Sequence, residues 1–259
     1  MKLKDKVVVV TGSGRGIGEA FARRFTAEGA KVVVTDIDAD AVARVAGEIG
    51  SVGLAADITV EDNVRAVAEL ARSNYGEIDV WFSNAGVAGP RQLGEIPDNA
   101  LWDLGWDLHV MAHVYAAREV LPAMLERGDG YLIQTASIVG LTIQPEKAAY
   151  SVSKHAAVAL AEWLAVTYGD RGIRVSCFCP GAMLTPMFLA NGLAPDHPAV
   201  KMALTPEQVA EVLVHGIDAE RFLILDRSGS TEEVLAKGND YDEWIRAARG
   251  RARAFDPKS

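Results

Sequence analysis

Seven short apolar runs, rich in Val and Ile, recur along the chain and alternate with longer segments of helical periodicity. Continuous hydrophobicity within such runs is typical of strands that are covered on both faces of a sheet. Strands that alternate with helices in this way build a parallel sheet, because each crossover needs a helix-length connection. The chain is therefore predicted to be an α/β protein, a doubly wound parallel sheet of about seven strands with helices on both faces. The predicted strands are residues 7–12, 31–36, 52–57, 79–84, 130–137, 173–180 and 221–226.

Length and charge narrow the class of protein. With 259 residues, 49% of them hydrophobic, the chain can bury one substantial core, and we expect residues 1–259 to form a single domain. The net charge of −9 disfavours nucleic acid and anionic lipid as partners. The apolar runs are too short for a signal peptide or a membrane span. We expect a cytoplasmic protein with no nucleic-acid partner and no membrane partner.

The cysteine and histidine pattern does not indicate a metal site. Cys177 and Cys179 are two residues apart in one predicted strand, which is poor geometry for a disulfide between them. We expect both thiols to be free, as in a reducing compartment. The His, Cys and carboxylate residues form no ligand-like cluster in the sequence, so no metal site is predicted (metal: none).

The first predicted strand leads directly into the glycine-rich stretch "TGSGRGIG". Gly12, Gly16 and Gly18 would allow a tight turn and a close approach of a pyrophosphate to the start of the following helix. Asp36 ends the next strand, near the expected place for an acid that hydrogen-bonds the adenosine ribose of NAD. An ordinary strand-to-helix loop would explain the glycines alone. The glycine turn and the acid together predict a dinucleotide site.

The stretch "AAYSVSKHAAVALAEWLAVTYG", residues 148–169, is predicted to be a helix that is apolar on nearly every side. Tyr150 and Lys154 are one turn apart on its apolar stripe. A lysine near a helix N-terminus also opposes the helix dipole. An interfacial tyrosine and a surface lysine are common separately, but this placement of the pair indicates a functional role.

Several motifs in this order resemble the short-chain dehydrogenase/reductase family. They are TGxxxGxG, the "NAG" at residues 84–86, Ser137, the "YSVSK" thirteen residues later, and "PGAMLT" after the sixth strand. The match runs from about Lys4 to Thr185. The resemblance implies a Rossmann fold and a hydride transfer between a nicotinamide cofactor and an alcohol or ketone.

The resemblance also implies roles for individual residues. Tyr150 is expected to be the general acid/base, Ser137 to position the substrate oxygen, and Lys154 to hold the nicotinamide ribose and lower the pKa of Tyr150. An ammonium about 4 Å from the phenol at an effective dielectric of 20 supplies on the order of 4 kcal/mol, which matches a fall of about 3 pKa units. The expected cofactor-binding residues are Gly12, Arg15, Gly16, Ile17, Gly18, Asp36, Ile37, Asp57, Ile58, Asn84, Ala85, Gly86, Val110, Tyr150, Lys154, Pro180, Gly181, Met183 and Thr185.

His109 departs from the family pattern, which usually has Asn at this position of the helix predicted over residues 100–126. In the family that Asn helps to hold a water that leads protons away from the lysine. Imidazole can donate and accept, so His109 is a candidate catalytic residue of the same proton path. The alternative is that His109 is only a hydrogen-bonded packing residue.

The cofactor preference and the substrate are predicted from charge. Asp36 would repel the 2′-phosphate of NADP, so NAD is the expected cofactor and NADP the less favoured one, although Arg15 acts in the opposite direction. The expected pocket segments, residues 87–92, 138–144 and 183–189, are mostly apolar apart from Arg91. They favour an uncharged, apolar secondary alcohol or ketone. The rival function is a non-catalytic dinucleotide-binding sensor or scaffold.

Two further segments have predicted roles. Residues 182–204 interrupt the pattern after the sixth strand and are interpreted as a substrate lid, followed by a helix that Thr205, Pro206 and Gln208 would begin. Residues 240–259 are predicted to form a docked C-terminal helix with a disordered basic tail.

A homodimer or homotetramer is expected, packed through the apolar helix over residues 148–169 and the helix over residues 100–126.

Overall fold

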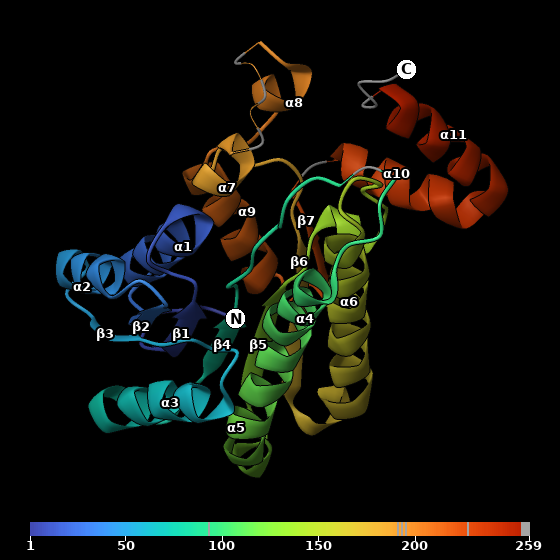
Figure 1. Cartoon of the computed structure of the whole chain (residues 1–259). Coiled ribbons are helices and arrows are strands. Elements are labelled where there is room, and N and C mark those ends of the chain that lie inside the picture. Colours follow the sequence, from blue (N-terminus) through green and yellow to red (C-terminus); the bar gives the residue numbers. More distant parts are fainter. Residues whose placement is uncertain (93, 191, 193, 195, 227, 255–259) are drawn as a thin grey trace.

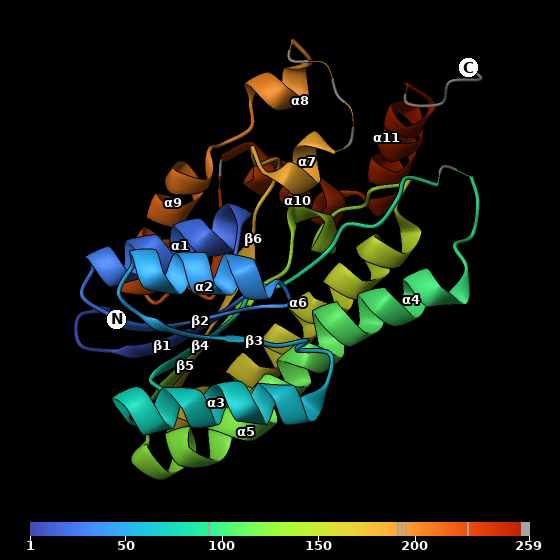
Figure 2. The same cartoon turned by 60° about the vertical axis from the view of Figure 1, so that its left-hand side comes forward.

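Seven parallel strands form one sheet in the order β3-β2-β1-β4-β5-β6-β7 (Figures 1 and 2). The structure is a computed structural model, which describes residues 1–259 except 93, 191, 193, 195, 227 and 255–259. The strand order reverses between β1 and β4, so the crossover helices cover both faces, as predicted. The strands are β1 (Val7–Thr11), β2 (Lys31–Asp36), β3 (Val52–Ala55), β4 (Val80–Ser83), β5 (Gly130–Thr135), β6 (Ile173–Cys179) and β7 (Leu223–Leu225).

The continuous apolar runs supply two cores, one on each face of the sheet. Val7 and Val9 of β1 pack with one set of helices, whereas Val8 and Val10 pack with the other, because side chains alternate along a strand. The first set is α3 (Glu61–Tyr75), α5 (Ala112–Arg127) and α6 (Ala148–Tyr168); the second is α1 (Gly16–Ala27), α2 (Ala39–Glu48) and α9 (Pro206–Asp218). Figure 2 shows α1 and α2 above the sheet with α3 and α5 below it. No helix in the described part of the chain is long and apolar enough to cross a membrane.

The helix predicted over residues 100–126 is not continuous. The chain forms α4 (Asn99–Trp106), then a π-helical segment, η1 (Asp107–Met111), and only then α5. A π turn carries one extra residue, which changes the direction of the side chains that follow, and such turns occur mostly at functional sites. In η1 the turn leaves His109 and Val110 buried.

The segment predicted as a lid contains two short helices, α7 (Pro186–Leu189) and α8 (Pro198–Lys201). Its two ends are joined, since the Leu184 amide donates to the Leu204 carbonyl at 2.8 Å and the Leu204 amide donates to the Ala182 carbonyl at 3.2 Å. The next helix, α9, begins with the capping box of Thr205 and Gln208, as predicted. The segment therefore leaves and re-enters the body of the protein at one point, and its movement as a lid stays a prediction.

The thiols of Cys177 and Cys179 are both buried on β6 and both free. Their Sγ atoms are 3.6 Å apart, well beyond the length of a disulfide bond. This confirms the expectation from their spacing.

The C-terminal region forms two helices, α10 (Ser228–Asn239) and α11 (Tyr241–Ala254), at the end of the sheet that carries α7 and α8 (Figure 1). Helix α10 was not predicted from the sequence. Trp244 and Ala248 of α11 are buried, which fits the predicted docking of this helix, whereas Tyr241 is exposed. The helix also continues through Arg249 and Arg253, where a disordered basic tail was predicted, because arginine is a good helix former. Residues 255–259 of that tail lie outside the described residues.

Lys237 of α10 connects the C-terminal helices to the body of the protein. Its ammonium donates to the Leu141 carbonyl at 2.8 Å and lies 3.3 Å from His155 Nε2. It also lies 5.1 Å from the ring centre of Trp244 and 5.6 Å from that of Tyr241. One cation therefore joins α10, α11, α6 and the loop after β5.

We predict that Lys237→Met loosens α10 and α11 without unfolding the sheet. The charge-assisted hydrogen bond and the cation–π contacts together amount to more than about 1.4 kcal/mol, so local opening should increase at least about tenfold. Chymotrypsin cleavage after Tyr241 or Trp244, followed by mass spectrometry, measures that opening. Lys31→Met, at an exposed position of β2, is the control. Equal cleavage of Lys237→Met and wild type would contradict the prediction.

Candidate active site

A cavity of about 570 Å³ lies at the carboxyl ends of the strands, where the strand order reverses. This volume is ordinary for a small-molecule site. The expected cofactor-binding residues line it with a single exception, Val110, which is buried in η1 and is not among the lining residues. Val110 was expected at the cofactor site from the family resemblance, and its contact with the cofactor stays a prediction. Thr35, Thr59 and Thr135 also line the cavity and were not predicted. Only their positions at or near strand ends could have indicated that they belong to the site.

The glycine turn is required by the close packing between β1 and α1. Gly12 has φ +64°, and a Cβ on it would lie 2.7 Å from the Ala85 Cα. A Cβ on Gly18 would lie 1.9 Å from the Gly12 carbonyl oxygen. Arg15, the N-cap of α1, makes no side-chain hydrogen bond to the first turn in the described structure. The first residues of α1, Gly16, Ile17 and Gly18, line the cavity, and a helix start without a side-chain cap is a place where a phosphate can bind.

Asp36 holds the glycine turn from the end of β2. Its Oδ2 accepts the Gly14 amide at 3.0 Å and its Oδ1 accepts the Asp38 amide at 3.2 Å. The carboxylate also lines the cavity. A carboxylate has about four acceptor sites, so both oxygens can accept further hydrogen bonds from the hydroxyls of a ribose.

A buried polar network joins the ends of three strands to α6. Thr11 Oγ1 accepts the amides of Asn84 and Ala85 at 2.9 and 3.1 Å, and Asn84 Nδ2 donates to the Thr11 carbonyl at 3.0 Å. Thr135 Oγ1 donates to Asn84 Oδ1 at 3.1 Å, and Lys154 Nζ donates to the Thr135 carbonyl at 2.9 Å. This network explains why a lysine is tolerated near a helix start, since its ammonium bonds to a strand carbonyl inside the protein.

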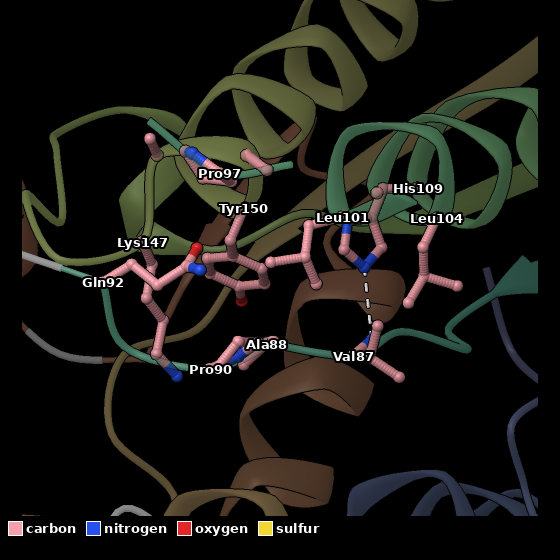
Figure 3. A pocket seen from close by; sticks show the side chains of 14 residues that line it. Val87, Ala88, Pro90, Gln92, Pro97, Leu101, Leu104, His109, Lys147 and Tyr150 are labelled. Carbon is pink, nitrogen blue, oxygen red and sulfur yellow. Dashed lines mark hydrogen bonds between the residues drawn. The ribbon is translucent and has the colours of Figure 1, made fainter. Parts of the chain in front are cut away.

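Tyr150, Ser137 and Lys154 meet at the edge of the cavity, and all three line it. Ser137 is the N-cap of a short 3-10 turn, η2 (Ile138–Gly140), and its Oγ accepts the Val139 amide at 3.1 Å. The Lys154 ammonium is 5.8 Å from the centre of the Tyr150 ring. Figure 3 shows the phenol pointing into the adjoining pocket. The three side chains are brought together as predicted from the sequence.

Burial shifts the pKa values of the phenol and the ammonium in opposite directions. Burial raises the pKa of Tyr150, and a hydrogen bond with Ser137 acts against that rise. Burial lowers the pKa of Lys154 to about 8. Desolvation of the phenolate sets the direction for the pKa of Tyr150 in the protein alone, and the expectation that Lys154 lowers this pKa stays a prediction.

His109 is hydrogen-bonded at both ring nitrogens. The Val87 amide donates to Nε2 at 3.2 Å (Figure 3), and Nδ1 lies 2.9 Å from Ser153 Oγ. The ring also stands edge-on to the Tyr150 ring, with centroids 5.6 Å apart and an interplanar angle of 86°. His109 thus lies beside the reacting phenol rather than in the cofactor cavity.

A second, smaller pocket opens beside Tyr150 (Figure 3). Five of the six residues of the predicted segment 87–92 line it, all but Arg91. The predicted segment 138–144 lines neither pocket in the described structure, because η2 turns it away. Leu101, Leu104 and Lys147 were missed, and only the position of Lys147, three residues before Tyr150, could have indicated it. Arg91 pairs with Glu146 at 3.0 Å.

The donor set fits a dinucleotide better than a metal ion. The glycine turn can hold phosphates and Asp36 can accept ribose hydroxyls, and Lys154 and Tyr150 line the same cavity. Among the described residues, no group of three or more His, Cys, Asp and Glu side chains is placed to hold a metal ion. The site therefore has the parts for hydride transfer with acid/base assistance.

The comparisons with known proteins agree with this site. The family model for short chain dehydrogenases matches residues 6–193. The chain belongs to the short-chain dehydrogenase/reductase family. It is an NAD(P)-dependent oxidoreductase with a Rossmann fold.

Three similar proteins illustrate the match. The 1-deoxy-11-beta-hydroxypentalenate dehydrogenase of Streptomyces exfoliatus is 37% identical over 253 residues, which cover 94% of this chain and 90% of that protein. The cyclohexanol dehydrogenase of Acinetobacter sp. (strain SE19) is 32% identical over 220 residues, covering 82% and 87%. The crystal structure of a short chain dehydrogenase/reductase from Burkholderia phymatum in complex with NAD superposes with a TM-score of 0.84 at 28% identity, covering 93% and 96%.

Removing the Asn84 amide from the polar network should destabilise the fold. Asn84→Ala should lower the free energy of unfolding by about 1–3 kcal/mol, because Thr11 and Thr135 would each keep a buried group without its partner. Urea unfolding followed by circular dichroism measures the change. The matched control, Asn74→Ala on the exposed face of α3, should stay within about 0.5 kcal/mol of wild type. An Asn84→Ala protein as stable as wild type would show that the network contributes nothing.

Proposed function

We propose that this enzyme transfers a hydride between NAD and an uncharged, apolar secondary alcohol or ketone. The observation that carries the proposal is the meeting of Tyr150, Ser137 and Lys154 at the large cavity, where Tyr150 also lines the smaller pocket. The glycine turn, Asp36 and Lys154 would hold the cofactor in the large cavity, and the bound nicotinamide would supply or accept the hydride.

The chain's own residues handle the proton and the orientation of the substrate. In the direction of ketone reduction, the Tyr150 hydroxyl donates its proton to the carbonyl oxygen, and Ser137 donates a hydrogen bond to the same oxygen. In alcohol oxidation the phenolate accepts the hydroxyl proton as the carbinol carbon loses its hydride. Lys154 holds a ribose hydroxyl and is oriented for this by the Thr135 carbonyl. Burial raises the pKa of Tyr150 and keeps the phenol protonated near neutrality, so Tyr150 can act as a proton donor.

The apolar substrate is supported by the walls of the two pockets. Val87, Leu101 and Leu104 line the smaller one, while Met183 and Met187 of the proposed lid line the larger one. Cyclohexanol dehydrogenase carries the name of a small apolar alcohol, and hydroxypentalenate dehydrogenase that of a larger hydroxylated compound. We infer a secondary alcohol or ketone of moderate bulk, over which residues 182–204 close.

The preference for NAD is supported by the surroundings of Asp36. Its carboxylate faces the cavity where a 2′-phosphate would lie. Arg15 is exposed at the same rim, whereas Arg44 bonds to the Gly14 carbonyl and pairs with Glu19. That pairing lowers the pKa of Glu19 to about 2, so Arg44 is held away from a phosphate.

We also infer a cytoplasmic location and a homo-oligomer. The free thiols of Cys177 and Cys179 suit a reducing compartment. The outer face of α6 exposes a stripe formed by Val152, Ala159, Trp163 and Val166, and Val166 is 86% exposed. An apolar stripe of this kind is typical of a surface that a second subunit covers.

Tyr150→Phe should abolish turnover and leave NADH binding nearly unchanged, because it removes the proton donor but not the cavity. In wild type, alcohol oxidation should rise with pH to a plateau, since it needs the phenolate, while ketone reduction should fall at high pH, since it needs the phenol. Absorbance of reduced cofactor across a panel of secondary alcohols, with NADH binding by fluorescence, measures both. Substantial turnover by Tyr150→Phe would overturn the assignment, and binding without turnover in wild type would favour the sensor.

Asp36→Asn should narrow the preference for NAD while keeping the contact with the Gly14 amide. Like charges about 4 Å apart cost on the order of 4 kcal/mol at an effective dielectric of 20, so wild type should prefer NAD by at least about a hundredfold in kcat/KM. Steady-state kinetics with both cofactors measure the ratio, and Arg15→Ala is the companion variant, expected to lower the rate with NADP. Equal efficiency of wild type with both cofactors would contradict the prediction.

Val166→Glu should dissociate the oligomer, because it places a charge at the most exposed position of the apolar stripe. Light scattering at micromolar concentration should give wild type a mass of two or four times 27.7 kDa and the variant a smaller mass. Ile96→Glu, at a position that is 89% exposed and far from the stripe in the sequence, is the control and should keep the wild-type mass. A monomeric wild type would refute the proposed assembly.

A further inference from the structure

His109 occupies a position from which it contacts the catalytic tyrosine and the substrate side of the site at once. It lies in the π-helical segment η1 and is 1% exposed. Its Nε2 meets the Val87 amide, and Val87 lines both the cofactor cavity and the smaller pocket. Its Nδ1 meets Ser153, which follows Tyr150 by three residues on α6. The imidazole therefore connects the loop after β4 to the catalytic turn of α6.

The hydrogen bonds leave one arrangement of protons. A backbone amide can only donate, so His109 Nε2 must carry a lone pair toward Val87. The Ser153 hydroxyl donates to the Tyr150 carbonyl at 3.1 Å, so Ser153 Oγ accepts from His109 Nδ1–H. The ring is neutral, with its hydrogen on Nδ1.

The charges around the ring oppose its protonation. Lys154 on α6 and His113 on α5 are the titratable groups that act on it, and Tyr150 presents its ring. A Cβ built on Gly86 would lie 3.4 Å from His109 Nε2 and 3.5 Å from Lys154 Nζ, so the lysine and the imidazole approach the same point of the chain. Burial, with Lys154 next, lowers the pKa of His109 well below its ordinary value. A proton on Nε2 would also face the Val87 N–H and remove its acceptor.

We propose that His109 is a positioning residue: a neutral imidazole, protonated at Nδ1, that fixes Val87 and the Tyr150 turn of α6 relative to each other and carries no proton in turnover. The proposal rests on the proposed function, since Tyr150 is the group whose placement matters. The sequence left two roles open for His109, a part in the proton path or simple packing. The proposed positioning role is neither of these. It makes His109 a determinant of how the substrate meets the phenol.

Side-chain length supplies the test. The amide of Asn reaches only the position of Nδ1, so His109→Asn can still bond to Ser153 but leaves the Val87 amide without an acceptor. The longer Gln reaches the position of Nε2, so His109→Gln can accept from Val87 but loses Ser153. The Asn variant should therefore raise the KM for the alcohol about tenfold, the scale of one lost hydrogen bond, with kcat changed less than about threefold. The Gln variant should keep KM within about threefold of wild type.

A relay histidine would give a different pattern. Both variants would then lose kcat rather than KM, and a step would disappear from the pH profile of kcat. Either of those results overturns the proposal. So does an equal, wild-type KM in both variants, which would reduce His109 to packing.

A measurement on wild type needs no turnover, so it separates a failure of this proposal from a failure of the proposed function. In ¹⁵N-histidine-labelled protein, the resonances missing from either variant belong to His109. They should show a protonated Nδ1 and an unprotonated Nε2 from about pH 5.5 to about pH 9. A proton on Nε2, or an imidazolium signal in that range, would overturn the proposal even if neither wild type nor variant turns over. Absence of turnover in a protein with the expected tautomer would instead count against the enzyme assignment.

Discussion

The hydrogen bond from the Lys154 ammonium to the Thr135 carbonyl fixes the active site to the sheet. Thr135 ends β5 and also bonds through its side chain to Asn84, which in turn bonds to Thr11 at the end of β1. The catalytic helix, the dinucleotide turn and the central strands thus share one buried network. In a low-dielectric interior such a network is stable only when every member is paired, which couples the position of α6 to that of the glycine turn.

The same burial decides the charge state of the reacting groups. It raises the pKa of Tyr150 and lowers the pKa of Lys154 to about 8, so both groups are moved toward their neutral forms. His109, beside the phenol, is moved the same way. A site that holds little charge of its own costs less to bury, and it can respond strongly to the charge that a cofactor brings. The protein alone therefore presents Tyr150 as an acid.

Local chemistry made much of this fold predictable from sequence. The Val-rich runs place all seven strands because both faces of a parallel sheet are apolar, and Gly12 and Gly18 are identifiable because nothing larger fits. The features that were missed depend on tertiary contacts. The π turn of η1 has no sequence signature, so the break between α4 and α5 was not predicted. The pKa of Tyr150 could not be judged from the Lys154 spacing alone, because its direction follows from how much water the fold excludes.

The charge state of Tyr150 in the free enzyme tests this account most directly. Ultraviolet difference titration of wild type against Tyr150→Phe, without cofactor, isolates the phenolate of this residue. No Tyr150-dependent absorbance is expected below about pH 10, the ordinary value for a tyrosine, because burial raises the pKa of this phenol. A phenolate that forms near neutral pH in the free enzyme would contradict it, and would show that Lys154 alone activates the tyrosine.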